Sequence, residues 1–265
     1  MATVKDIYRY LDKLAPFSTQ MGFDNAGFLV GREEMGVTRV LVALDITQEV
    51  VQEAAELGCS LIVSHHPVIF HPVKTVTDQT VTGRILLALA EQHIAAICAH
   101  TNLDAAQGGV NDCLAQILGL QEIGQLHPDG VDAQGQPYGI GRVGLVHSAG
   151  LNASAYAAYV KERLGAASVR YVEGGRPVRQ VAVGGGSCGS MLEDAVVAGC
   201  DTFVTADVKY DQYLQAKALG ISLMDAGHFA TEHVVCGPLA EKLAKEFPKV
   251  EVLLSTCHHE VYRGV

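Results

Sequence analysis

The seven cysteines of this chain include no C-x-x-C pair, and an odd number cannot all pair within one chain. Zinc fingers and disulfide-stapled secreted domains need closely spaced or paired cysteines, so the sequence argues against both classes. Most of the cysteines lie within apolar runs, where a buried free thiol is the usual state. We therefore expect no disulfide among positions 59, 98, 113, 188, 200, 236 and 257.

The chain also lacks any apolar run near the ~20 residues that a membrane-spanning helix needs. Its first residues, MATVKDIYRYLDKLAP, have the pattern of a charged amphipathic helix and contain no signal-peptide core. We therefore expect a folded protein without a membrane partner, with the cytoplasm as its default location.

Basic residues are too few to balance the acidic ones, and the net charge is -10. An acidic surface does not attract nucleic acids or anionic membranes, so broad nucleic-acid binding is not expected. A cation suits this charge if the carboxylates converge. With 265 residues, 49% of them hydrophobic, the chain can form one large domain or two moderate ones.

Apolar strands alternate with amphipathic helices in both halves, which is typical of an α/β fold with largely parallel sheets. In the first half we predict strands at residues 40–44, 61–64 and 94–99, and helices at 3–14, 47–57, 83–92 and 110–118. In the second half we predict strands at residues 181–183, 202–205 and 221–224, and helices at 190–198 and 210–219.

Between the two halves the periodicity is lost, and Gly, Pro, Asp and Gln accumulate. This composition predicts a first α/β domain at residues 1–126, a connection at 127–142 and a second α/β domain at 143–265. The C-terminal helix of the second domain could pack back on the first.

The two halves also resemble each other at the ends of their strands. Residues 58–66, GCSLIVSHH, align with residues 199–207, GCDTFVTAD. Ala99-His100-x-x-x-Asp104 aligns with Gly227-His228-x-x-x-Glu232. The chain is therefore predicted to be internally duplicated, with two similar domains and a metal site between them.

Two adjacent histidines end the apolar run that starts at Leu61. Pro67 keeps His66 out of the helical region and stops the strand ladder there. Along an extended backbone, neighbouring side chains point to opposite sides, so His65 and His66 would each serve a different ion. A pair of exposed loop histidines is the alternative.

The other candidate ligands are spaced four residues apart, which puts two side chains on one face of a helix. A single H-x-x-x-E pair is often only a surface helix contact, but ligands in parallel α/β sheets bind beyond the carboxyl ends of strands, where all these residues lie. The nitrogen and oxygen donors suit zinc, iron or manganese, and a carboxylate such as Glu232 can bridge two ions ~3.5 to 4 Å apart. The pooled donors are His65, His66, Asp104, His228 and Glu232, with His100 nearby as the candidate catalytic residue.

A dinucleotide site is a competing interpretation of the second half. Residues 184–189, GGGSCG, satisfy G-x-G-x-x-G between a predicted strand and helix, and Asp207 ends the next strand. The equivalent turn of the first half, which contains Asp45, has no such glycines, and a nicotinamide site would not explain the histidines. A weaker version of this interpretation is that the backbone amides of residues 184–189 bind the phosphate group of a substrate.

Taken together, these motifs resemble the NGG-interacting-factor-three-like family of dinuclear-metal proteins, often catalogued as GTP cyclohydrolase 1 type 2. The likeness extends over nearly the whole chain, and three positions depart from it: Phe23 replaces a common tryptophan, Ala206 a glycine and Asp211 a histidine. The motifs are Asp24-Asn25-x-Gly27, Ala43-Leu-Asp45-Ile-Thr47, Ser64-His-His-Pro67, His100-Thr-x-x-Asp104, Gly108-Gly109-Val-Asn111, Thr205-x-Asp207-x-Lys209-Tyr210 and Asp225-Ala-Gly-His228-x-x-x-Glu232.

The resemblance implies two divalent metal ions per chain, carried by His65, His66, Asp104, His228 and Glu232, in a toroidal homohexamer. It also implies a short form that lacks the domain inserted in longer members. We therefore expect a metal-dependent hydrolase of a small molecule, with a nucleotide as the favoured substrate. The alternative is a non-catalytic metal-binding or regulatory protein, because an open coordination position predicts catalysis and a saturated one predicts a structural role.

Overall fold

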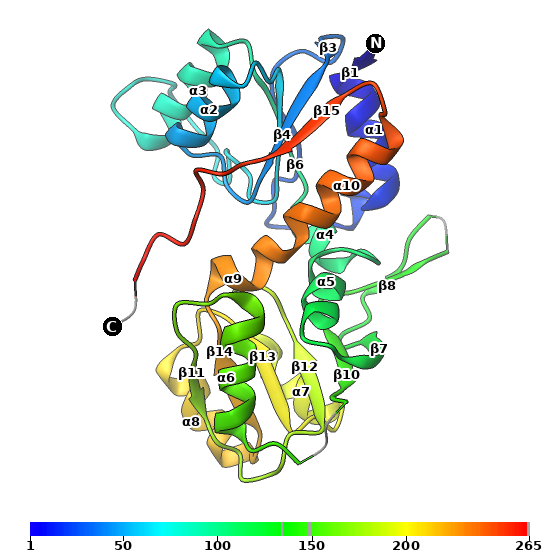
Figure 1. Cartoon of the computed structure of the whole chain (residues 1–265), viewed down its shortest axis with the longest axis vertical. Coiled ribbons are helices and arrows are strands. Elements are labelled where there is room, and N and C mark those ends of the chain that lie inside the picture. The colour runs from blue at the N-terminus through cyan, green and yellow to red at the C-terminus, as the bar shows by residue number, and fades with distance from the viewer. Residues whose placement is uncertain (134, 148–149, 264–265) are drawn as a thin grey trace. The chain divides into compact units, whose positions relative to one another are not determined.

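The computed structural model describes residues 1–133, 135–147 and 150–263. The chain forms two compact units, one from residues 1–103 with 236–259 and one from residues 104–235 with the residues from 260 onward. Each unit is a mixed sheet with helices on both faces (Figure 1). The predicted α/β class is therefore confirmed.

The first unit is built on a five-stranded sheet in the order β15-β4-β5-β6-β2. Three of its strand pairs are parallel, and only β2 runs antiparallel to its neighbour β6. All four residues of β5 are buried, as the continuous apolar sequence of a central parallel strand requires. The strands are β2 (Gly27–Val30), β4 (Arg39–Ala43), β5 (Leu61–Ser64), β6 (Ala95–Cys98) and β15 (Glu251–Leu254).

Helices α2 (Gln48–Glu56) and α3 (Val81–Glu91) cover one face of this sheet, and α1 (Val4–Leu14) and α10 (Cys236–Glu246) lie on the other side (Figure 1). Helix α1 begins where Thr3 and Asp6 form a capping box, which satisfies two amides at the helix start. The short strands β1 (Ala2–Thr3) and β3 (Gly36–Val37) pair antiparallel beside it, and a 3₁₀ turn follows at Phe17–Thr19.

The second unit has a six-stranded sheet in the order β11-β14-β13-β12-β10-β7. Only β12, β13 and β14 are parallel, so this sheet is more mixed than the predicted largely parallel one. The strands are β7 (Gln121–Gln125), β10 (Arg142–Leu145), β11 (Arg170–Val172), β12 (Gln180–Val183), β13 (Thr202–Thr205) and β14 (Ser222–Asp225).

Two apolar cores cover the two faces of this second sheet. Helices α5 (Val110–Ile117) and α6 (Ala153–Leu164) pack on one face, and α7 (Leu192–Val197) and α8 (Tyr210–Leu219) pack on the other. The short helices α4 (Thr101–Ala105) and α9 (His228–Glu232) follow β6 and β14 directly. Short 3₁₀ turns occupy Gly189–Met191 and His233–Val235.

The boundaries of the two compact units do not coincide with the connection predicted at residues 127–142. This segment lies within the second unit, where β8 (Gly130–Val131) and β9 (Pro137–Tyr138) form a hairpin. Helix α10 belongs to the first unit. The domain limits 1–126 and 143–265 describe the proposed duplication and stay a prediction.

All seven cysteines are free thiols, as the sequence predicts. Burial raises the pKa of Cys59 to about 11 and that of Cys98 to about 12, so both stay protonated at neutral pH. Among the residues that the structure describes, no helix is long and apolar enough to cross a membrane.

A buried arginine connects the start of α5 to strand β10 in the second unit. Arg142 is only 2% exposed, and its guanidinium donates to Asp112 at 2.7 Å and to the carbonyl oxygens of Gly139, Gly141 and Ala106. A planar guanidinium has enough donors to serve all these acceptors at once. This contact fixes the segment that follows Asp104.

We predict that Arg142→Met lowers the free energy of unfolding by ~3 to 5 kcal/mol, because it leaves a partly buried carboxylate and several carbonyls without their donor. Urea unfolding followed by circular dichroism measures this change. The control is Arg179→Met in the same unit, where the side chain is exposed and a change within ~0.5 kcal/mol is expected. Equal stabilities of the two variants would contradict the structural role of Arg142.

Candidate metal centre

Three histidines gather in the first unit at the carboxyl ends of two neighbouring parallel strands. His65 and His66 follow β5, and His100 follows β6. One ring nitrogen of each lies within 4.8 Å of the other two, a spacing at which they could hold a metal ion. His65 is fully buried, so at least one of these imidazoles lies away from bulk solvent.

The Nδ1 atom of each of these histidines faces an oxygen that can only accept a hydrogen bond. His65 Nδ1 lies 2.8 Å from the carbonyl oxygen of Ala99. His66 Nδ1 lies 2.8 Å from Asp45 Oδ1, and His100 Nδ1 lies 2.7 Å from Asp24 Oδ1. An imidazole whose Nδ1 donates to such an oxygen has Nε2 as its metal-binding atom.

The carboxylate that binds His100, Asp24, is ionised at neutral pH. Its side chain is completely buried, and burial alone would raise its pKa. Hydrogen bonds from His100 and Thr101 outweigh that effect and lower the pKa of Asp24 to about 2. A buried carboxylate that stays charged at neutral pH fixes the orientation and tautomer of the imidazole above it.

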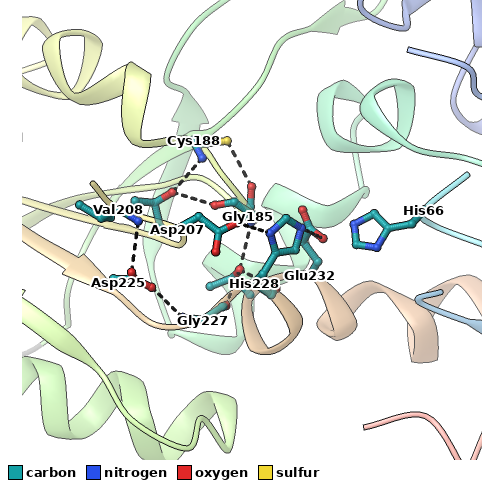
Figure 2. Close-up of polar contacts among 12 residues, drawn as sticks. His66, Gly185, Cys188, Asp207, Val208, Asp225, Gly227, His228 and Glu232 are labelled. Carbon is teal, nitrogen blue, oxygen red and sulfur yellow. Dashed lines mark hydrogen bonds and ion pairs between the residues drawn. The ribbon is translucent and has the colours of Figure 1, made fainter. Parts of the chain in front are cut away.

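In the second unit, His228 and Glu232 occupy the first and last positions of α9 (Figure 2). His228 Nε2 lies 2.9 Å from a carboxylate oxygen of Glu232, which confirms that the two side chains share one helix face. His228 Nδ1 donates to Asp207 Oδ2 at 2.7 Å. Asp207 has a φ of 52°, a strained conformation for this residue that directs its carboxylate at His228.

A second carboxylate lies beside Glu232. Asp104 and Glu232 are 8% and 3% exposed, and a carboxylate oxygen of one lies within 4.8 Å of the other. Asn111, fully buried, donates from its side-chain amide to the backbone oxygen of Asp104 at 2.9 Å and so holds this segment in place. Like charges at this separation repel, and a bound cation would relieve that repulsion.

Several amides of the glycine turn at residues 184–189 already donate to partners within the second unit. Gly185 N donates to Asn111 Oδ1 at 2.9 Å, and Gly186 N donates to Thr231 Oγ1 at 3.0 Å. Helix α7 starts only at Leu192, and the carboxylate of Asp207 binds His228 (Figure 2). The amides of Gly185 and Gly186 and the carboxylate of Asp207 therefore already have partners within the second unit, which argues against a dinucleotide there.

Instead, the turn makes room for the carboxylate of Glu232. A Cβ atom at Gly186, where φ is 63°, would lie 2.0 Å from Glu232 Oε1 and 3.2 Å from His228 Nε2. Real Cβ atoms do not approach an oxygen this closely, so any side chain here must displace Glu232. Glycine at position 186 thus reflects the close approach of the backbone to Glu232, a candidate ligand.

We predict that Gly186→Ala weakens metal binding at Glu232, because the new methyl group displaces the carboxylate. The matched control is Gly199→Ala, since Gly199 has a φ of 80° but no heavy atom near its Cβ position. Both variants carry the ~1 to 2 kcal/mol strain of a left-handed alanine. Titration calorimetry with Zn²⁺ should show weaker binding for Gly186→Ala alone, and equal affinities would contradict this role of the turn.

Cys188 lies in the same turn but is a poor metal ligand in this environment. Burial raises the pKa of its thiol, and the charges of Asp104 and Glu232 raise it further. The thiol donates to the carbonyl oxygen of Gly185 at 3.2 Å (Figure 2). The candidate donors therefore remain nitrogen and oxygen atoms.

The structure differs from the sequence expectation at His65 and His66. Strand β5 ends at Ser64, and both histidines lie in a bend, so their side chains do not alternate as on an extended strand. Their ring centroids are 5.0 Å apart. The sequence does not predict that Asp24, Asp45 and Asp207 hold histidine Nδ1 atoms, although each lies in one of the motifs named above.

The chain is similar to proteins of one family throughout its length. A family model described as Duf34/NIF3 (NGG1p interacting factor 3) matches residues 2–260. A "GTP cyclohydrolase 1 type 2 homolog" of Streptomyces coelicolor is 39% identical over 241 residues, covering 89% of this chain and 84% of the relative. One of Clostridium perfringens is 34% identical over 254 residues, covering 95% of each. A crystal structure of a Staphylococcus aureus hypothetical protein has a TM-score of 0.92 and 32% identity, covering 99% of each chain.

Proposed function

Because the chain belongs to the Duf34/NIF3 family, we propose that it is a dinuclear-metal-dependent hydrolase of a small molecule, with a nucleotide as the favoured substrate class. The proposal combines two ligand sets that occur in different units. The first contributes His65 and His66, and the second contributes Asp104, His228 and Glu232. Two similar domains with the metal site between them remain the arrangement that we propose.

One observation carries the metal assignment. Four imidazoles, those of His65, His66, His100 and His228, each donate from Nδ1 to an oxygen acceptor. A solvated surface histidine does not need a fixed acceptor for its Nδ1 proton. A metal-binding histidine nearly always donates its second ring N–H to an oxygen in this way. The residues present thus fit divalent ions, and their nitrogen and oxygen donors suit zinc, iron or manganese.

Divalent ions at this centre would supply Lewis acidity that activates water for hydrolysis. Within the chain, His100 is the proposed catalytic residue, because its Nδ1 is held by the buried anion Asp24 and its Nε2 can accept or return a proton. Glu232 would be shared between the ions, and its charge would offset their mutual repulsion. Asp104 would serve one ion as a terminal ligand.

A nucleotide is favoured because relatives more than 30% identical are named GTP cyclohydrolase 1 type 2 homologs. The same family resemblance supports a toroidal homohexamer. Analytical ultracentrifugation at micromolar concentration distinguishes that assembly from a monomer.

We predict that purified protein contains up to two divalent transition-metal ions per chain and that Glu232→Gln loses at least one of them. The substitution keeps the size of the side chain but removes the charge that offsets two dications. Asp104→Asn should lose less, because it removes the charge of a ligand to one ion. Elemental analysis measures the metal, and circular dichroism checks the fold. If Glu232→Gln keeps both ions while Asp104→Asn loses both, the two roles must be exchanged.

The test of the reaction is chromatography of GTP incubated with the metal-loaded wild type. We expect ring-opened or hydrolysed product from the wild type and none from the metal-stripped protein or from Glu232→Gln. Two bound ions without turnover of GTP or other nucleotides would contradict the hydrolase and favour a non-catalytic metal-binding protein.

A further inference from the structure

Asp45 is a carboxylate that receives hydrogen bonds from two imidazoles within the first unit. Its Oδ1 lies 2.8 Å from His66 Nδ1, and its Oδ2 lies 2.8 Å from Nε2 of His258 in the C-terminal segment. Both distances are those of an imidazole N–H group that donates to a carboxylate oxygen.

His258 differs from its neighbours in the C-terminal segment. Its side chain is only 7% exposed, whereas Cys257 and His259 are exposed. A tail histidine without a role would be solvated like His259. The segment therefore buries one imidazole selectively, and it does so against the carboxylate that orients a candidate metal ligand.

Contacts with α2 fix the segment just before His258. Glu53 accepts hydrogen bonds from Ser255 Oγ at 2.6 Å and from both the amide and the hydroxyl of Thr256 at 2.7 Å. Ser255 N continues the pairing of edge strand β15 by donating to Val42 O in β4. The segment that leads from β15 to His258 is thus short, and hydrogen bonds fix two consecutive residues in it, Ser255 and Thr256.

We propose that His258 is a positioning residue of the candidate metal centre, acting through Asp45 on His66. This inference rests on the proposed metal-binding function and extends the centre to the C-terminal segment. A carboxylate held at one oxygen can still turn about its side-chain bonds. When His258 holds the second oxygen, the plane of Asp45 is fixed, and with it the direction of His66 Nε2.

The test compares Co²⁺ binding by the wild type, His258→Leu, His258→Gln and the control His259→Leu, using competition with a chelator and the visible absorption of bound cobalt. His258→Leu should weaken binding at the position that uses His66 by about 10- to 100-fold and change the absorption bands, as outer-sphere substitutions do. His258→Gln should retain most of both properties, because its amide can donate to Asp45. His259→Leu should match the wild type.

Three outcomes would overturn the inference. His258→Leu could match the wild type in affinity and spectrum, or His258→Gln could lose as much as His258→Leu while circular dichroism shows an intact fold. If the wild type itself bound no cobalt, the proposed metal centre would fail, and the role of His258 would fail with it. In the first two cases the wild type still binds cobalt, so they remove only the role of His258.

Discussion

Hydrogen bonds donated by the Nδ1 atoms of four histidines are the interaction on which the rest of the candidate centre depends. Three of the acceptors are aspartates, and the fourth is the carbonyl oxygen of Ala99. Each bond decides the tautomer of an imidazole and the direction of its Nε2 lone pair. Without these bonds, the imidazole rings would have no fixed tautomer or orientation.

The oxygen atoms that accept these hydrogen bonds lie at strand ends and in the loop before β2. Asp45 follows β4, and Asp207 follows β13, so parallel strands bring a carboxylate to the same edge of the sheet as a histidine. Asp24 comes instead from the loop before β2, and its bonds to His100 and Thr101 hold that loop against the start of α4. The glycine turn adds a steric constraint, because only glycine at position 186 leaves room for Glu232.

Much of this arrangement follows from local sequence, and the rest does not. The buried strands β5 and β13 and the pair His228 and Glu232 have short-range signals, namely apolar runs and a four-residue spacing. Strand β7 is mostly exposed and polar, so no periodicity reveals it. The bond between Asp45 and His258 joins residues far apart in the chain, and long-range contacts such as the pairing of β15 with β4 bring them together. The bend after Ser64 likewise overrides the alternation expected of a strand.

Anomalous diffraction from crystals grown with Zn²⁺, measured on both sides of the zinc absorption edge, tests the dinuclear centre most directly. The predicted result is two zinc peaks per chain, with the Nε2 atoms of His65, His66 and His228 ~2.0 to 2.1 Å from a peak and Glu232 bound to both. A single peak, or peaks remote from these nitrogens, would contradict a dinuclear centre formed by these residues.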